Sequence, residues 1–331
     1  MVKDFAKPIN KIAVFTSGGD GPGMNANIRA VVRTALYHNK EIVGIMRGYE
    51  GMIDNEFIPM DARSVSNIIH RGGTILKTAR SERFRTNEGR RLAYGNLIAN
   101  GIDGIIAIGG DGTFTGAEVF FSEYGIPIIG TPGTIDNDLY GTDYTIGYDT
   151  AINTAIEAID KIRDTAASHN RLFFIEVMGR DSGCIALAAG IGGGAEHILL
   201  PERSTSVEHL VEVLERGAKN KKTSSIVIVA EGEQGGGAYK IAEKVKERAS
   251  DYDVKVTVLG HVQRGGSPTC FDRVLASRLG VEATEALIRG ECRKMAGLIN
   301  NKVVFTPFAD ATNKDFVLDK SLLRIAEILA I

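Results

Sequence analysis

Two carboxylates stand two residues apart at the end of one stretch, GTPGTIDND at positions 130–138. An apolar run, Ile126–Ile129, leads into it and is typical of a buried strand. The Thr-Pro-Gly that comes next favours a sharp turn out of the sheet. If the segment beyond is extended, Asp136 and Asp138 point to the same side, where paired carboxylates suit proton abstraction or metal binding. The alternative is a surface turn whose Asp residues only cap the next element of the chain.

Two glycine loops precede that stretch. TSGGDGPG at 16–23 lies between an expected strand and an expected helix, and GGDGT at 109–113 follows a second strand. Bare backbone N–H groups and a helix N-terminus favour a phosphate in such loops. Asp111 adds a carboxylate of the kind that Mg²⁺ binds together with phosphate oxygens. The alternative is an ordinary turn with Asp111 as the helix N-cap. Neither the dinucleotide fingerprint nor the P-loop motif is present, so the loops do not identify the nucleotide.

Cations and hydroxyl-binding groups follow other expected strands. Arg80 lies in an arginine-rich segment that is either a solvated face or a phosphate contact. In the second half of the chain, arginines and one glutamate suit a sugar phosphate, because planar guanidinium groups match phosphate oxygens and a carboxylate accepts from hydroxyls. For His261, contact with phosphate is favoured over the alternative of a structural histidine. The residues of this second group are Arg171, Arg180, Glu231, His261 and Arg264.

The composition narrows the class of protein. The 331 residues are enough for two domains, and the net charge of −2 gives no basic excess for nucleic acid or a membrane surface. The three cysteines have no paired spacing, which predicts a reduced cytoplasmic compartment and no zinc site. The longest uncharged run, residues 182–195, is too short to span a bilayer, and no apolar run suits a signal peptide.

Strands and helices alternate along the chain, which predicts an α/β fold of two doubly wound α/β/α domains with mainly parallel sheets and an active site in the interdomain cleft. The expected strands are residues 11–15, 41–46, 104–108, 126–129, 171–178, 197–200, 225–230 and 254–259, the last being the final clear strand. The expected helices cover about 24–37, 64–70, 87–100, 150–165, 207–218, 239–249, 272–288 and 318–329. One more follows the GGDGT loop and runs to about 123, and another begins at Gly183.

Five motifs in order resemble those of the ATP-dependent 6-phosphofructokinases, the phosphofructokinase A family. They are TSGGDGPGMN at 16–25, GGDGT at 109–113, PGTIDND at 132–138, MGR at 178–180 and GHVQRGGSP at 260–268. The resemblance covers nearly the whole chain. It implies transfer of the γ-phosphoryl group of ATP to the 1-hydroxyl of fructose 6-phosphate, the committed step of glycolysis, with Mg²⁺ as cofactor. It also implies a nucleotide-binding domain of residues 1–147 plus 263–313 and a sugar-phosphate-binding domain of 148–262 plus 314–331.

The resemblance assigns roles to individual residues. Asp136 is implied as the general base, with Thr134 beside it and with Arg80 and Arg171 stabilising the charge of the moving phosphoryl group. Arg171 resembles a residue that the family lends across a subunit boundary, which implies a homotetramer. The implied ATP contacts are Gly19, Arg80, Ser81, Gly110, Asp111, Gly112 and Thr113, with Asp111 also the metal ligand. The implied substrate contacts are Thr134, Ile135, Asp136, Asp138, Arg171, Met178, Gly179, Arg180, Glu231, Lys255, His261 and Arg264.

Three sets of residues bear on which ligands the protein binds. The pyrophosphate-using branch tends to carry Asp and Lys where this chain has Gly112 and Gly133, so ATP is favoured as donor. Lys255 stands where the family usually has Arg, and a point charge holds a phosphate less selectively than a planar fork. An effector site for ADP or phosphoenolpyruvate is implied, but Ala62 replaces one of its usual arginines. The implied effector contacts are Arg29, Arg33, Arg163, Glu196 and Lys222.

Other functions fit the sequence less well. The NAD and diacylglycerol kinases also use a GGDGT loop, but they do not account for PGTIDND or GHVQRGG. A pyrophosphate-dependent phosphofructokinase is opposed by the two glycines above. A non-catalytic nucleotide sensor or regulatory subunit would be marked by loss of Asp111 or Asp136, and both are present.

Overall fold

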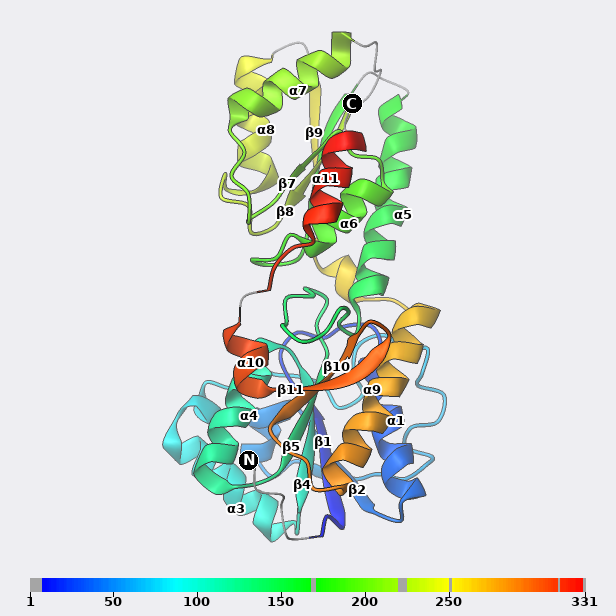
Figure 1. Ribbon diagram of the computed structural model, residues 1–331, viewed down its shortest axis with the longest axis vertical. Helices are drawn as coiled ribbons and strands as arrows, with labels where there is room; N and C mark the ends of the chain where they lie inside the picture. The colour runs from blue at the N-terminus through cyan, green and yellow to red at the C-terminus, as the bar shows by residue number, and fades with distance from the viewer. Residues whose placement is uncertain (1–7, 168–170, 220–224, 250–251, 315, 330–331) are drawn as a thin grey trace. The chain divides into compact units, whose positions relative to one another are not determined.

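The computed structural model describes residues 8–167, 171–219, 225–249, 252–314 and 316–329. These residues divide into two compact units, each assembled from separate parts of the chain. Unit 1 draws on residues 8–135, 139–149 and 264–316, with a gap at 315, and unit 2 draws on 136–138, 150–263 and 317–329 with the gaps above. Both units have an α/β fold in which helices cover the two faces of a sheet (Figure 1).

The described residues of unit 1 form a seven-stranded sheet in the order β11-β10-β5-β4-β1-β2-β3. The five inner strands are parallel, and the two edge strands pair antiparallel with their neighbours. The central strands are apolar runs such as IAVF and GIIAIG, which suit a sheet buried on both faces. The bounds are β1 (Lys11–Thr16), β2 (Glu41–Ile45), β3 (Phe57–Pro59), β4 (Gly104–Gly109), β5 (Ile128–Pro132), β10 (Lys294–Ile299) and β11 (Lys302–Pro307).

Alternate residues of these strands enter two different cores. Ile12 and Val14 of β1 pack on one face with helices α1 (Met24–Tyr37) and α9 (Cys270–Ile288), while Ala13 and Phe15 pack on the other. This alternation is what a pleated strand between two helical layers requires. The helices of the second face are α2 (Gly48–Ile53), α3 (Asn87–Ala99), α4 (Asp111–Tyr124) and α10 (Phe308–Asn313), with the short 3₁₀ turn η1 (Arg83–Arg85).

Several sequence predictions for unit 1 are wrong. The sheet is mainly parallel, as predicted, but residues 254–259 are not the final strand, because the β10–β11 hairpin follows. Asn300 and Asn301 form its turn with φ of 49° and 59°, the left-handed pair that a tight two-residue hairpin turn needs. The helix expected at 64–70 is a series of turns, whereas α2 and β3 were not predicted. The strand expected at 126–129 begins at Ile128 and continues to Pro132.

Unit 2 holds, in its described residues, a four-stranded parallel sheet in the order β7-β8-β6-β9. Its helices α7 and α8 pack over one face, and α6 and α11 pack together on the other (Figure 1). The strands are β6 (Arg171–Val177), β7 (His197–Leu199), β8 (Ser225–Ala230) and β9 (Asp253–Val258). The helices are α5 (Tyr148–Ala167), α6 (Cys184–Gly192), α7 (Val207–Lys219), α8 (Gly237–Arg248) and α11 (Lys320–Leu329), and the 3₁₀ turn η2 (Gly260–Arg264) follows β9.

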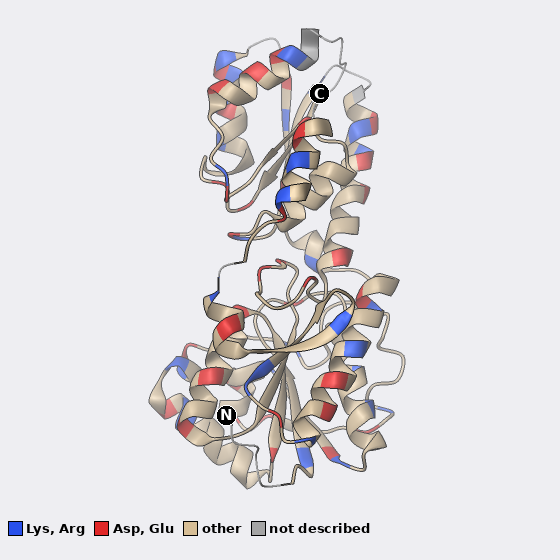
Figure 2. Cartoon of the chain, viewed as in Figure 1, with Lys and Arg blue, Asp and Glu red and all other residues tan. Residues whose placement is uncertain are grey.

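Charged side chains lie mainly on helices and loops, while the inner strands of both sheets are largely uncharged (Figure 2). None of the helices in the described ranges combines the length and the apolar character needed to cross a membrane.

The order of strands in unit 1 creates a switch point. From β1 the chain moves to β2 on one side, whereas β4 lies on the other side of β1. The loops that follow β1 and β4 therefore diverge at the carboxyl edge of the sheet. Open parallel sheets bind their ligands at this position.

Candidate active-site residues

The loop that follows β1 brings bare backbone to the switch point. Gly18 has a φ of 87°, a left-handed value that glycine adopts without strain. A Cβ on Gly19 would lie 2.5 Å from Nη1 of Arg264, and the same Nη1 donates to the carbonyl of Asp20 at 3.1 Å. Arg264, predicted as a sugar-phosphate contact, thus lies against this loop in unit 1.

The loop that follows β4 ends directly in a helix. Gly110 is the N-cap of α4 and Asp111 is its first residue, so the alternative interpretation of Asp111 as an N-cap is wrong. A Cβ on Gly109 would meet Oγ1 of Thr113 at 2.3 Å, whereas Gly112 faces open space. The exposed Asp111 carboxylate therefore stands beside a helix N-terminus, where the backbone dipoles favour a bound anion.

The loop that follows β5 joins the same edge. The backbone N–H of Gly133 donates to the carbonyl of Gly109 at 3.0 Å, and a Cβ on Gly110 would lie 3.5 Å from that of Thr134. A Cβ on Gly133 would come within 2.9 Å of Ile108, a contact that real Cβ atoms do not make. Three loops from neighbouring strands thus converge, as the sequence predicts for a phosphate site.

Asp136 is almost completely buried. It is 2% exposed, and its Oδ2 lies 3.6 Å from Nε of Arg180, whose side chain is 54% exposed. The expectation of an extended segment is wrong, because Asn137 between the two carboxylates has a φ of 51°. Alternation along a strand therefore does not place Asp138 on the same face as Asp136, and Asp138 is only partly buried.

Arg80 is exposed and lies in a segment without helix or strand. Within the described part of the chain it makes no hydrogen bond or ion pair. The neighbouring Ser81 is engaged in the fold, since its hydroxyl donates to Glu50 and accepts from the backbone N–H of Phe84 at 3.1 Å. The two predicted ATP contacts in this segment thus differ, one open to solvent and one used internally.

In unit 2, several predicted substrate contacts gather at the carboxyl ends of β6, β8 and β9. The backbone N–H of Arg180 donates to the Glu231 carboxylate at 3.3 Å, and that of Met178 donates to Oε1 of Gln263 at 2.9 Å. Gly179 has a φ of 145°, which suits only glycine. His261 in η2 is exposed, and among the described residues it has no hydrogen-bond partner, which argues against the structural alternative.

Two other predicted substrate contacts lie at the opposite end of that sheet. Arg171 begins β6, and Lys255 is the third residue of the adjacent β9. Both contact Asp253, whose Oδ2 accepts from Nε of Arg171 at 3.0 Å and whose Oδ1 lies 2.7 Å from Nζ of Lys255. Hydrogen bonds from Lys255 and then Arg171 lower the pKa of Asp253 below its usual value. One carboxylate thus holds both cations.

The predicted effector residues fall in both units. Arg29 and Arg33 line a pocket of about 410 Å³ in unit 1, where burial and the charge of Arg33 lower the pKa of Arg29. In unit 2, Arg163 donates to the carbonyl of Gly194 at 2.7 Å, and Glu196 accepts from the backbone N–H of Ile226 at 2.5 Å. Lys222 lies outside the described residues.

Sequence reasoning missed three residues that touch predicted site residues. Glu50 and Asp253 carry no motif, and their partners lie far away in the sequence or on a neighbouring strand. Gln263 lies within the GHVQRGG motif, so the signal was present. Gln263 is fully buried, and its side-chain Nε2 has no hydrogen-bond partner in the described structure.

Comparison with known proteins assigns the chain to a family. The phosphofructokinase family matches residues 11–287, which is most of the chain. The chain belongs to the phosphofructokinase family. The "ATP-dependent 6-phosphofructokinase" of Cytophaga hutchinsonii is 58% identical over 321 residues, covering 97% of this chain and 98% of that protein. The "ATP-dependent 6-phosphofructokinase 1" of Thermus thermophilus is 56% identical over 323 residues, covering 98% of this chain and all of that protein.

Solved structures agree with the fold. The phosphofructokinase of Saccharomyces cerevisiae superimposes with a TM-score of 0.87 and 38% identity, over 97% of this chain and 47% of that longer chain. A pyrophosphate-dependent phosphofructokinase from Marinobacter aquaeolei gives a TM-score of 0.83 at 23% identity, which speaks for the fold alone. The mainly parallel α/β architecture is therefore that of the family.

Proposed function

We propose that this protein is an ATP-dependent 6-phosphofructokinase, which transfers the γ-phosphoryl group of ATP to the 1-hydroxyl of fructose 6-phosphate and releases fructose 1,6-bisphosphate and ADP. The observation that carries the proposal is the similarity of nearly the whole chain, at 56–58% identity, to relatives of that name. The convergence of two glycine loops and the Gly133 turn at a switch point supports it independently.

A coupled assay on the purified full-length protein tests the proposal. Fructose 6-phosphate is supplied with Mg²⁺ and either ATP or pyrophosphate, and formation of fructose 1,6-bisphosphate is followed. We expect turnover with ATP and none above background with pyrophosphate. The proposal would be overturned if pyrophosphate supported turnover and ATP did not, or if neither donor supported turnover.

The two glycines that favour ATP differ in their surroundings. A side chain at Gly133 would collide with Ile108 at 2.9 Å and with Met24 at 3.1 Å, so the lysine of the pyrophosphate-using branch does not fit this backbone. Gly112 faces open space, so an aspartate there would be accommodated and would add negative charge beside Asp111. The choice of ATP therefore depends on shape at one position and on charge at the other.

The donor set fits Mg²⁺. No cluster of three or more His, Cys, Asp or Glu side chains suitable for a metal occurs in the described ranges. Mg²⁺ in kinases needs no such cluster, because one or two carboxylates and the substrate phosphates hold it. The exposed Asp111 at the start of α4 would supply that carboxylate. When bound, the ion would offset the negative charge of the phosphates during transfer.

Asp136 is proposed to accept the proton of the sugar 1-hydroxyl as that oxygen attacks, with Thr134 beside it and with Arg80 stabilising the charge of the moving group. Because Asp136 is 2% exposed, the hydroxyl reaches it only if the surrounding side chains move. The Arg180 side chain, 3.6 Å from Asp136, is proposed to be the one that moves, because it is 54% exposed. The other proposed ATP contacts are Gly19, Ser81, Gly110, Gly112 and Thr113, and the other sugar contacts are Ile135, Asp138, Met178, Gly179, Glu231 and His261.

The positions of Arg171 and Lys255 support a homotetramer with shared active sites. Arg171 begins the seven-residue strand β6 and the Met178 group follows its end. At about 3.3 Å per residue these ends lie on the order of 20 Å apart, so one substrate does not reach both. We therefore propose that the two cations bind the 6-phosphate of a substrate held by another subunit, and that residues 1–147 with 263–313 and residues 148–262 with 314–331 are the nucleotide and sugar-phosphate domains.

Hybrid tetramers test the sharing. Arg171→Ala and Asp136→Ser chains are each expected to be nearly inactive alone. Mixed during refolding, they should recover activity, because some sites then receive both intact residues from different chains. No recovery in mixtures that ion-exchange chromatography shows to contain hybrid tetramers, which differ in charge from both parents, would contradict shared sites.

Regulation by ADP or phosphoenolpyruvate through Arg29, Arg33, Arg163, Glu196 and Lys222 is proposed on the resemblance, as is a cytoplasmic location. The pocket beside Arg29 and Arg33 supports an anion there. Fructose 6-phosphate saturation curves that ignore both effectors would contradict regulation, a result that Ala62 would explain.

A further inference from the structure

The segment around Arg80 is held by tethers on both sides of that residue. On the amino side, Oγ1 of Thr78 donates to the carbonyl of Gly18 in the first glycine loop at 2.6 Å. On the carboxyl side, Ser81 donates its hydroxyl to the carboxylate of Glu50. Since the segment has no helix or strand of its own, these contacts set the position of the Arg80 backbone.

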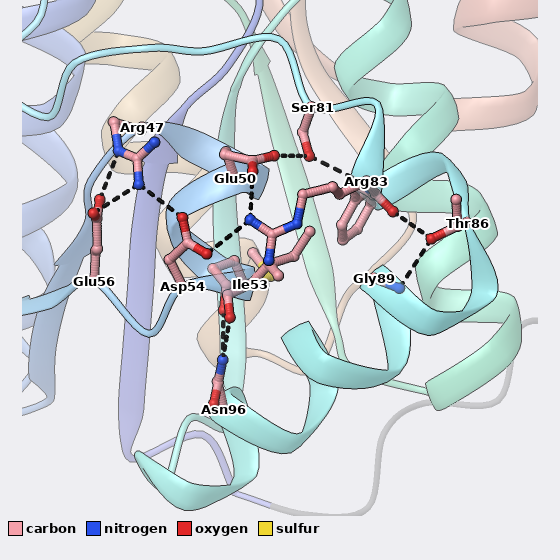
Figure 3. Close-up of polar contacts among 12 residues, drawn as sticks. Arg47, Glu50, Ile53, Asp54, Glu56, Ser81, Arg83, Thr86, Gly89 and Asn96 are labelled. Carbon is pink, nitrogen blue, oxygen red and sulfur yellow. Dashed lines mark hydrogen bonds and ion pairs between the residues drawn. The ribbon is translucent and has the colours of Figure 1, made fainter.

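Glu50 in α2 is the centre of the second tether. One carboxylate oxygen accepts from Ser81, and the other accepts from Nη1 of Arg83 at 2.6 Å (Figure 3). The Glu50 side chain is 16% exposed, so its charge is largely removed from water and depends on these partners. Hydrogen bonds to a charged group are about twice as strong as neutral ones. The two hydrogen bonds to Glu50 therefore hold Ser81 and Arg83, which follow Arg80 in the turn.

The helix that carries Glu50 is itself anchored to the second glycine loop. The ring of Tyr49 stacks on Phe84 with centroids 3.9 Å apart, and its hydroxyl donates to the carbonyl of Thr113 at 2.7 Å. Burial raises the pKa of Tyr49 far above its usual range, so the hydroxyl stays a donor. α2 thus links the Arg80 segment to the loop that begins α4.

A chain of ion pairs continues outward from Arg83. Arg83 also donates to Asp54 at 2.8 Å, Arg47 donates to Asp54 at 2.9 Å, and Arg47 binds Glu56 through two bonds of 2.9 and 2.7 Å (Figure 3). Glu56 is 38% exposed at the far end of this chain. Its hydrogen bonds and ion pairs in the described structure do not reach residues 78–85, which makes it a matched control for Glu50.

We propose that Glu50 is a positioning residue for Arg80. By binding Ser81 and Arg83, it fixes the turn that presents the Arg80 guanidinium, which itself has no partner in the described structure. The inference rests on the proposed function, in which Arg80 meets the ATP phosphates. Displacement of a charged group by about 1 Å can cost up to about a hundredfold in rate, so a tether of this kind controls catalysis without touching substrate.

Steady-state kinetics of Glu50→Gln and Glu56→Gln test the proposal. Both substitutions remove one carboxylate charge from the same network. For Glu50→Gln we expect kcat/KM for ATP to fall about tenfold, the size of one lost charge-assisted hydrogen bond, with KM for fructose 6-phosphate within about twofold. Glu56→Gln should leave both within about twofold. Equal effects of the two variants, or a rise in KM for fructose 6-phosphate as large as the fall in kcat/KM for ATP in Glu50→Gln, would overturn the proposal.

A double-mutant cycle with Arg80→Ala separates positioning from a merely structural role. If Glu50 acts through Arg80, adding Glu50→Gln to Arg80→Ala should cost little further activity, whereas additive losses would refute the proposal. Tryptic cleavage after Arg80, mapped by mass spectrometry, gives a readout without turnover and should be faster in Glu50→Gln than in Glu56→Gln. If the wild-type protein does not phosphorylate fructose 6-phosphate, the proposed function is wrong. Equal tryptic cleavage rates in Glu50→Gln and Glu56→Gln would contradict the role of Glu50 independently of that result.

Discussion

In unit 1 the glycine loops predicted to bind the nucleotide are set by backbone and close packing, whereas in unit 2 two predicted sugar-phosphate contacts, Arg171 and Lys255, are set by ion pairs between partly exposed side chains. Gly109 and Gly133 have no room for a Cβ, and the loops they belong to follow buried parallel strands. Arg171 and Lys255 are instead held by the single carboxylate of Asp253.

This difference means that the two units should respond differently to salt and pH. Steric fit does not change with salt or with pH near neutrality, while exposed ion pairs weaken as ions screen them over about 10 Å at 0.1 M. We therefore expect unit 1 to fix the geometry of the donor and unit 2 to adjust its grip on the acceptor. Substitutions in each unit, and a change to acidic pH, test whether the two units differ in this way.

Asp136→Ser tests the buried carboxylate that is paired with Arg180 of unit 2 and should have the largest effect. Removing a positioned base costs about 10²–10⁴-fold in rate, so we expect kcat to fall at least a hundredfold while KM for fructose 6-phosphate changes less than about twofold. Stopped and continuous assays of the purified variant measure both. A kcat within tenfold of wild type would remove Asp136 from the role of base.

His197 makes the stability of unit 2 depend on pH. Burial, and then the charges of His209 and Arg203, lower its pKa to about 4 from 6.5, and its Nε2 has no hydrogen-bond partner in the described structure. The unfolded chain therefore binds more protons between pH 6.5 and 4, so stability is unaffected by this group above pH 6.5 and is lost as pH falls toward 4. From pH 7 to pH 5 we expect unit 2 to lose about 2 kcal/mol.

Two buried cysteines allow each unit to be followed separately. Cys184 lies in unit 2 and Cys292 in unit 1, and burial raises the pKa of Cys184 to about 11. Urea-dependent labelling with a disulfide reagent that works in acid, read by peptide mass spectrometry, gives the unfolding midpoint of each. Acid should move the Cys184 midpoint more than the Cys292 midpoint, and His197→Phe should remove that difference. Equal shifts in His197→Phe and wild type would contradict the assignment.

Gly109→Ala and Gly112→Ala test packing in unit 1 against a matched site three residues away. The new methyl at 109 would meet Thr113 at 2.3 Å and the Ser17 carbonyl at 2.7 Å, whereas the one at 112 meets nothing within 4 Å. Overpacking costs about 1–3 kcal/mol, while Ala in an open helical position gains about 0.4–1 kcal/mol over Gly. The Cys292 midpoint should fall in the first variant and not in the second. The same sign in both would show that space at 109 does not limit the loop.

The sequence was sufficient for features encoded by neighbouring residues. The apolar runs of β1 and β4 and the glycines after them predicted both the strands and the loops that follow them, because strand period and turn chemistry are local. The β10–β11 hairpin was missed although Asn300 and Asn301 are a local turn signal. The helix expected at 64–70 is absent, since Ser64 closes a turn with Asp61 instead.

Long-range contacts were beyond the sequence for a physical reason. Ser81 and Arg83 meet Glu50 across more than 30 residues, and Arg264 closes on Asp20 across 244. A charged side chain has many possible partners in a sequence, and only the fold selects one. The motif predicted Asp136 as a chemical group but gave no sign that its carboxylate would be 2% exposed.

Asp253→Asn tests the ion-paired end of unit 2 and should have the smallest effect. Asp253 is itself half-exposed and neutralises part of the charge that Arg171 and Lys255 offer to a phosphate. Removing the carboxylate charge leaves two cations for one dianion, so KM for fructose 6-phosphate should fall about two- to threefold at low salt, the scale of exposed ion pairs. The gain should vanish near about 0.5 M salt, where screening is nearly complete.

Asp310→Asn, which breaks a similar exposed pair with Lys314 in unit 1, should leave KM unchanged. A rise in KM for Asp253→Asn would instead mean that the carboxylate orients the two cations, and the contrast between a rigid unit 1 and an adjustable unit 2 would fail at this point.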